Sequence, residues 1–136
     1  MGKIVHEHLS GAIIGIAMEV LNELKPGLDE RLYERALTIE LRRRGHAVTV
    51  QQSFPVFYRA ELIGELIPDL IVDRSVIVDP KVVTAFTETH VAQMLGYLNI
   101  TSLSLALLLN FKNARLDWKR VVGRQSEPDS PPDLTA

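Results

Sequence analysis

Apolar residues follow the spacing of an α-helix, three or four positions apart, in two stretches near the start of the chain. In residues 10–24 they are Ile13, Ile14, Ala17, Met18, Leu21 and Leu24. In residues 29–45 they are Leu32, Ala36, Leu37 and Leu41. Ser10 and Asp29 are favourable N-caps, while Gly27 and Gly45 are favourable stops, so the pattern predicts two amphipathic helices.

From Ala47 the pattern changes to a period of two, which is typical of β-strands. Valines alternate with polar residues up to Val50, Pro55 interrupts, and a second run follows before a break near residues 59–61. Two or three strands in antiparallel succession fit this pattern. Residues 66–72 and 76–78 are apolar on both faces, which favours strands in the middle of a covered sheet, joined by a turn at residues 73–75.

The second half of the chain predicts one more helix and two more strands. Helical spacing runs through residues 88–100, while residues 103–109 and 116–122 have the pattern of strands. Together the elements favour an α/β fold with a mixed sheet flanked by helices. We expect residues 1–122 to form one domain and the residues from 123 to 136, rich in Pro, Ser and Asp, to be a disordered tail.

Composition narrows the chemistry. With 136 residues, of which 46% are hydrophobic, the chain has the size of one globular domain. It has no apolar run of the ~20 residues that a membrane helix needs and no secretory signal, so we expect a cytoplasmic protein. The absence of cysteine excludes disulfides, a thiol nucleophile and cysteine-ligated zinc. Any metal must have oxygen or imidazole ligands, which points towards magnesium-like chemistry.

The net charge of -2 lacks the basic excess that usually marks nucleic-acid binding. Three acids and one base follow Gly123, which leaves 14 basic and 14 acidic residues in positions 1–123. A nucleic-acid site would therefore need a local patch. Arg31 and Arg35, one helical turn apart, are candidates for phosphate contact, although each alone is more simply explained as a solvated surface residue.

Two aspartates are expected to face each other across the predicted strand pair. A turn at residues 73–75 fixes the register so that Asp69 lies opposite Asp79 on the same face. Opposed like charges destabilise a strand pair unless something such as a divalent cation neutralises them. Lys81 shares this face and could offset the charge or stabilise a reacting phosphate. The alternative is a solvated hairpin end, where such residues are common.

Further candidates lie on the predicted helices. Glu30 shares a helical stripe with Tyr33, so it either points inwards or stabilises the first turn through the helix dipole. In the later helix, His90, Gln93 and Tyr97 fall within one narrow polar sector. Gln93 can bind a metal water or a phosphate, Tyr97 can contact a backbone phosphate, and His90 can donate to either. The alternative is an ordinary polar helix edge.

Gly27, Glu30 and Tyr33 stand three residues apart. With this spacing the chain resembles the GxxExxY proteins of the PD-(D/E)XK nuclease superfamily. The resemblance extends over about residues 9–122, because five further segments match in the same order. These segments are residues 14–20, 40–45, 68–70, 78–81 and 90–97.

The resemblance implies a PD-(D/E)XK restriction-endonuclease-like core and metal-dependent hydrolysis of phosphodiester bonds in nucleic acid, with DNA favoured over RNA. It implies four catalytic residues, Glu30, Asp69, Asp79 and Lys81. Of these, the three acids would bind Mg²⁺ or Mn²⁺. The expected contacts to nucleic acid or phosphate are Gln93, Tyr97, His90, Tyr33, Arg31 and Arg35, of which Gln93 and Tyr97 are similar to the QxxxY element of RecB-type nucleases. Endonuclease and exonuclease activity, and a homodimer, are left open.

Two positions depart from the family pattern. Asp79 stands where glutamate is usual, and its shorter side chain requires a tighter site. Pro80 replaces an aliphatic residue and removes a backbone donor, so the strand is expected to bulge or end there and turn Lys81 away from the metal. This motivates an alternative function, a catalytically degenerate nuclease fold that binds nucleic acid or a protein partner.

Overall fold

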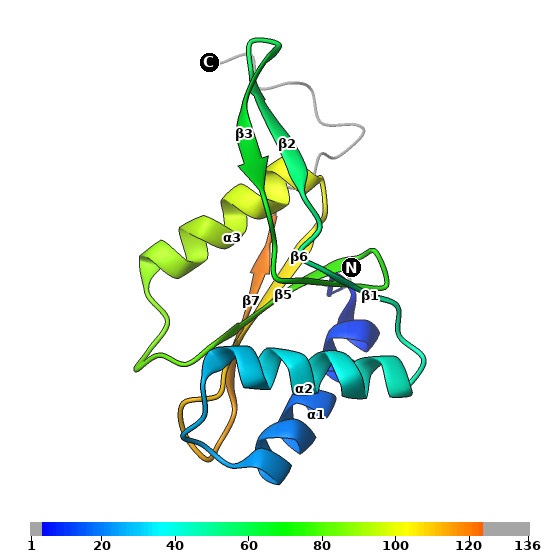
Figure 1. Ribbon diagram of the computed structural model, residues 1–136, viewed down its shortest axis with the longest axis vertical. Coiled ribbons are helices and arrows are strands. Elements are labelled where there is room, and N and C mark those ends of the chain that lie inside the picture. Colours follow the sequence, from blue (N-terminus) through cyan, green and yellow to red (C-terminus); the bar gives the residue numbers. More distant parts are fainter. Residues whose placement is uncertain (1–3, 124–136) are drawn as a thin grey trace.

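The computed structural model describes residues 4–123, which form a mixed sheet with helices on both faces (Figure 1). The sheet has the order β1-β4-β5-β6-β7, with β1 Val48–Val50, β4 Leu70–Val72, β5 Val76–Lys81, β6 Leu105–Asn110 and β7 Asp117–Val122. The helices of this region are α1 (Glu7–Leu24), α2 (Glu30–Arg43) and α3 (Glu88–Thr101). Strands β5 and β6 are parallel, and the other neighbours are antiparallel. The predicted α/β architecture is confirmed.

The sheet divides its side chains between two helical layers. On β5, Val78 belongs to the core formed with α1 and α2, whereas Ile77 belongs to the core formed with α3. Because strand side chains alternate with a period of two, Asp79 and Lys81 follow Ile77 on the α3 face. The placement of both charged residues therefore follows from the burial of their apolar neighbours.

The turn between β4 and β5 sets the register of this strand pair, as predicted. The Ser75 N–H donates to the Val72 carbonyl at 2.9 Å and closes the turn. Beyond the turn, Leu70 pairs with Val78. Asp69 precedes Leu70 directly and Asp79 follows Val78, so the register brings the two aspartates to the same end of the pair.

The first helix begins earlier than its predicted cap. Helix α1 starts at Glu7, and Ser10 lies inside it, where its hydroxyl donates to the Glu7 carbonyl at 3.1 Å. The apolar stripe continues upstream, because Val5 and Leu9 pack against the same core as the later residues of the helix. Asp29 occupies the N-cap position of α2, as predicted, although its side chain makes no capping hydrogen bond.

The antiparallel succession expected after Ala47 is confirmed for two strands, β2 and β3, but not for β1, which does not pair with β2. Strand β1 joins the main sheet beside β4, whereas β2 (Phe54–Tyr58) and β3 (Glu61–Leu66) form a separate two-stranded ribbon. Figure 1 shows this ribbon extending away from the sheet. Pro55 lies within β2 instead of interrupting it, since a strand with one partner tolerates a proline whose nitrogen faces outwards.

The segment predicted as one strand at residues 66–72 is two strands. Strand β3 ends at Leu66 and β4 begins at Leu70, with the buried Pro68 between them. Proline lacks a backbone donor and restricts the preceding residue, which favours a break in the strand. The break leaves Asp69 immediately ahead of β4, where its side chain is only partly buried.

The sequence analysis also predicted a disordered C-terminal tail and no membrane-spanning helix. The predicted disordered tail lies, apart from Gly123, outside the described residues. Within residues 4–123, no helix has both the length and the apolar character needed to cross a membrane.

Tyr33 ties α2 to the loop that precedes it. Its ring is fully buried and stacks on Phe111, with 4.8 Å between the ring centroids. Its hydroxyl donates to the Lys25 carbonyl at 2.6 Å and accepts from the Leu28 N–H at 3.1 Å. This double contact fixes the loop around Gly27, which has a positive φ of 111°. The expected phosphate contact by Tyr33 does not fit, because the ring is buried and the hydroxyl is occupied.

We expect Tyr33→Phe to lower the free energy of unfolding by roughly 1 to 2 kcal/mol, because it leaves the Lys25 carbonyl and the Leu28 N–H without their partner. Urea unfolding followed by circular dichroism measures the change. Tyr58→Phe is the matched control, since that side chain is 61% exposed and should be neutral. Equal effects of the two substitutions would contradict the anchoring role of Tyr33.

Candidate active site

The two aspartates meet at the end of the β4–β5 pair. Asp79 is 4% exposed, and the neighbouring Asp69 raises the pKa of its carboxyl group. Two neighbouring carboxylates repel each other unless one is protonated or a cation lies beside them. A bound cation would remove this repulsion.

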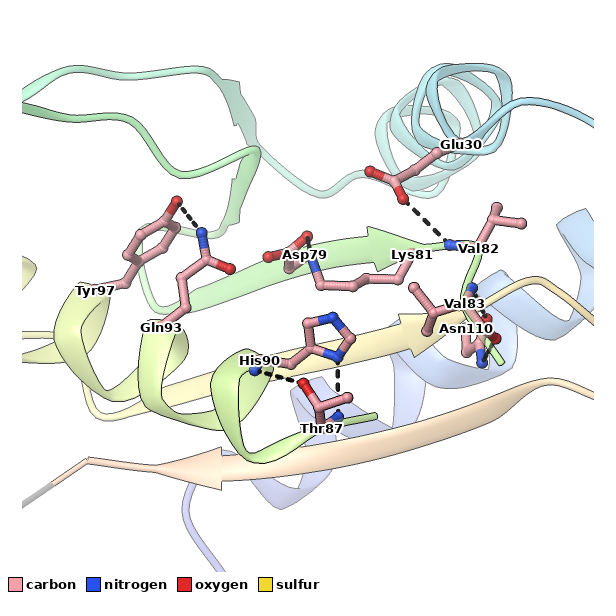
Figure 2. Close-up of polar contacts among 10 residues, drawn as sticks. All are labelled: Glu30, Asp79, Lys81, Val82, Val83, Thr87, His90, Gln93, Tyr97 and Asn110. Atoms are coloured by element: carbon pink, nitrogen blue, oxygen red, sulfur yellow. Dashed lines mark hydrogen bonds and ion pairs between the residues drawn. The ribbon is translucent and has the colours of Figure 1, made fainter. Parts of the chain in front are cut away.

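Lys81 completes a compact charged group on the same strand face. Its Nζ lies 3.3 Å from Oδ1 of Asp79, and both side chains are largely buried. Figure 2 shows Asp79 and Lys81 on β5, between side chains of α3 and Glu30 of α2. The structure thus brings together three of the predicted catalytic residues, Asp69, Asp79 and Lys81.

Pro80 neither bulges nor ends the strand, so that expectation is wrong. Strand β5 continues to Lys81 and stays paired with β6 throughout. The Phe111 N–H donates to the Lys81 carbonyl, so the backbone of Lys81 faces β6. Successive residues direct their backbone groups to opposite sides, which turns the nitrogen of Pro80 away from β6. On that side β4 begins only at Leu70, opposite Val78. Within residues 4–123, Pro80 therefore has no strand residue facing its nitrogen, and its missing N–H costs no hydrogen bond between strands.

Burial dominates the protonation of Asp79. Several effects, of which burial is the largest, together raise the pKa of this carboxyl from 3.8 to about 7. Within this total the positive charge of Lys81 lowers the pKa, whereas the neighbouring Asp69 raises it. A carboxyl that is desolvated beside a second acid strongly favours its neutral form unless a cation is added. The main chemical property of the site is therefore that its ionised carboxylates require a nearby positive charge.

Helix α2 brings two more acids towards the aspartates. Glu30, the first residue of the helix, accepts a hydrogen bond from the Val82 N–H at 3.2 Å. Glu34 is partly buried, and its pKa is raised by that burial and by the charges of Asp69 and Glu30. The sequence analysis did not single out Glu34. The signal was its position one helical turn after Glu30, which places both carboxylates on one helix face.

Helix α3 presents Gln93 and Tyr97 to the site (Figure 2). The Gln93 amide donates to the Tyr97 hydroxyl at 3.1 Å. Burial raises the pKa of Tyr97, and the charges of Asp79 and Asp69 raise it further, which places the phenol within the field of the two aspartates. The hydroxyl accepts from Gln93, so its own proton can be donated to a ligand.

His90 has a structural role at the start of α3. Its ring Nδ1 accepts from the backbone N–H of Thr87 at 3.0 Å, and the backbone N–H of His90 donates to the Thr87 hydroxyl at 3.2 Å. These two bonds form a capping box, with histidine at the position that Glu or Gln usually occupies. Because Nδ1 accepts, the ring proton of neutral His90 lies on Nε2.

Arg31 and Arg35 lie on the exposed side of α2. Their charges act on Glu34, whose pKa they lower in opposition to the acids around it. Both arginines line a groove beside α2 together with Glu30, Glu34 and Gln51. The structure therefore places two cationic side chains next to the acids, on a surface open to a ligand.

The donor set fits a magnesium-type cation held by two carboxylates. Among residues 4–123, no three acidic or histidine side chains converge into a ready-made metal cage. Mg²⁺ does not require one, because it keeps several waters and binds proteins through one or two carboxylates. Asp69 and Asp79 supply this number of ligands, and a cation would offset the repulsion between them.

The chain belongs to the PD-(D/E)XK nuclease superfamily, whose family model matches residues 7–121. This match includes every residue of the charged group and both helices beside it. It supports a nuclease-type function without distinguishing the GxxExxY proteins from other members. No curated protein and no solved structure matches the chain.

We expect Asp79→Asn to change how stability depends on pH in metal-free protein. The pKa of Asp79 is raised in the folded state, so the native protein binds more protons than the unfolded chain between pH 4 and about 7. The free energy of unfolding of the wild type should fall over this range and level off above it. The variant should lack this fall and be more stable at pH 8 by roughly 2 to 4 kcal/mol.

Urea unfolding in EDTA from pH 4 to pH 8 measures this difference. Asp117→Asn, at an exposed position of β7, is the control and should follow the wild-type profile. A wild-type protein whose stability rises from pH 4 to pH 7 as much as that of Asp79→Asn would rule out the raised pKa.

Proposed function

We propose that this protein is a Mg²⁺-dependent phosphodiesterase that hydrolyses nucleic acid, with DNA favoured over RNA. The observation that carries the proposal is the buried Asp79, which lies next to Asp69 and 3.3 Å from Lys81 in a PD-(D/E)XK domain. A purely structural group of this kind would be costly, because burial opposes the charge of Asp79. A role in binding a cation explains why both acids are present.

In this proposal Asp69 and Asp79 hold the cation. Mn²⁺ can replace Mg²⁺, because both prefer oxygen ligands. When bound, the cation supplies Lewis acidity towards the scissile phosphate and the attacking water. The carboxylates must be ionised to bind it, so a bound cation would favour the charged form of Asp79, whose pKa is raised in the free protein.

Lys81 stabilises negative charge on the phosphate. Its ammonium is directed towards the aspartates instead of the solvent, so a phosphate bound beside them would lie within its reach. Tyr97 can donate its proton to a phosphate oxygen while Gln93 fixes its orientation. We further propose phosphate contacts by Arg31 and Arg35 along the α2 groove and by the Nε2–H of His90.

We expect purified protein to cleave DNA in Mg²⁺ and not in EDTA. Asp69→Ala and Lys81→Met should each lower the cleavage rate by a factor of about 100 or more, because each removes a group that acts on the charge of the transition state. A gel assay with supercoiled plasmid, linear duplex, single-stranded DNA and RNA measures this. Asp117→Asn should cleave like the wild type. No cleavage of any substrate with either Mg²⁺ or Mn²⁺ would refute the proposal.

The second candidate is a degenerate nuclease fold that binds nucleic acid or a protein without cutting. The observation in its favour is the formal neutrality of residues 1–123, with 14 basic and 14 acidic side chains. Pro80 no longer supports it, because the strand passes through this residue unbroken and Lys81 faces Asp79.

Calorimetric titration with Mg²⁺ separates the two candidates. The phosphodiesterase should bind the cation in one saturable process, and Asp79→Ala should weaken binding at least tenfold, while Asp117→Asn should not. A degenerate site should give no saturable binding in the wild type either. Binding that survives Asp79→Ala unchanged would place the cation elsewhere on the protein.

A further inference from the structure

The chain leaving the active-site strand is fixed from two sides. Lys81 is the last residue of β5, and its carbonyl accepts from the Phe111 N–H at 2.9 Å. The next residue, Val82, donates its N–H to Glu30, and Val83 is bound by the side chain of Asn110. Figure 2 shows both contacts at the end of the strand arrow. The backbone after Lys81 therefore stays ordered although the sheet has ended.

Asn110 continues the β5–β6 ladder with its side chain. It is 3% exposed and pairs with Lys81 in the parallel register. Its Oδ1 accepts from the Val83 N–H at 3.2 Å, and its Nδ2 donates to the Val83 carbonyl at 2.8 Å. This two-point contact reproduces what a strand residue would provide. Val83 has the same alternation as Lys81, so its backbone faces β6, where Asn110 lies.

Glu30 takes the place of a strand on the opposite side. Val82 is two residues after Pro80, so its N–H points to the same side of β5. Strand β4 does not extend far enough to pair with it there. Glu30 accepts this N–H at 3.2 Å from the first turn of α2. Pro80 has no N–H and needs no acceptor. The Val82 N–H is therefore the first backbone donor on this side after Val78, and Glu30 is its acceptor.

The contacts of Glu30 separate it from the two aspartates. Asp69 acts directly on the Asp79 carboxyl, whereas Glu30 accepts a hydrogen bond from the Val82 amide beyond Lys81. Within residues 4–123 it does not combine with them into a three-ligand group. A carboxylate that accepts from a neutral N–H needs only its oxygen, and a glutamine side chain offers an oxygen at the same position.

We propose that Glu30 is a positioning residue that holds the Val82 backbone and so keeps Lys81 on Asp79, and that it is not a ligand of the metal. This inference rests on the proposed function for its effect on cleavage. Its structural content, a hydrogen bond that needs an acceptor but no charge, can be tested without it.

The test compares Glu30→Gln with Glu30→Ala. Glutamine keeps the acceptor and removes the charge, so Glu30→Gln should retain the Mg²⁺ affinity within about threefold and recover most of the cleavage that Glu30→Ala loses. We expect Glu30→Ala to cleave 10 to 100 times more slowly through kcat, with Mg²⁺ affinity within about threefold of wild type. Glu23→Gln and Glu23→Ala, at an exposed position of α1, are the matched controls.

A metal ligand would behave differently. Loss of Mg²⁺ affinity by tenfold or more in Glu30→Gln, as expected for Asp69→Asn, would overturn the proposal. So would equal cleavage by Glu30→Gln and Glu30→Ala when both are at least tenfold slower than wild type, because the acceptor would then have no effect.

Amide hydrogen exchange gives a readout that does not depend on activity. In Glu30→Ala the Val82 N–H should exchange at least tenfold faster, while the Val76 N–H in the body of β5 should not change; Glu30→Gln should protect Val82 like the wild type. Unchanged exchange of Val82 in Glu30→Ala would overturn the proposal. If the wild type neither binds Mg²⁺ nor cleaves, the proposed function fails, and this exchange pattern still decides the role of Glu30.

Discussion

The opposition of two carboxyl groups at the end of the β4–β5 pair governs the rest of this structure. Asp79 is buried on the α3 face of the sheet, and this burial together with the neighbouring acid Asp69 raises its pKa to about 7. Lys81 offsets part of the charge, but one ammonium cannot balance two ionised carboxylates. The surrounding elements supply polar partners from α2 and α3, and what remains is a demand for positive charge. That demand is the reason for proposing metal-dependent chemistry at this site.

The position of this pair depends on the short length of β4. A longer strand would cover β5 beyond Val78 and enclose the aspartates on both edges. Instead β4 begins at Leu70, after the break at Pro68, and leaves one side of β5 open. The N-terminus of α2 lies at this opening. There Glu30 accepts from the Val82 backbone N–H, and the charge of Asp69 raises the pKa of Glu34. Among the described residues, strand β5 thus has no strand partner along one edge beyond Val78.

Much of this arrangement could be predicted from the sequence. The turn at residues 73–75 and the two apolar runs fixed the register, so the position of Asp69 next to Asp79 followed from a count of residues. The family pattern fixed the order of the elements. These features depend on local periodicity and on neighbours in the chain, which a sequence displays directly.

Other features depend on contacts between distant segments, and the sequence did not reveal them. Strand β1 pairs with β4 across the whole β2–β3 ribbon, which no local pattern specifies. Tyr33 belongs to the family motif, yet its hydroxyl serves the loop before α2 and not a ligand. The sequence shows that Pro80 lacks a backbone N–H, but not that this position points away from any strand partner in the described part of the chain. The expected break in β5 was therefore wrong.

The direction of that missing N–H bears on how related chains are judged. At a position whose backbone nitrogen faces no partner, selection for hydrogen bonding is absent, and proline is as admissible as valine. A survey that treats an imino acid between the motif aspartate and lysine as a mark of inactivation would discard members whose charged groups are intact. Whether the neighbouring strand extends past the motif is the better criterion for sorting such sequences.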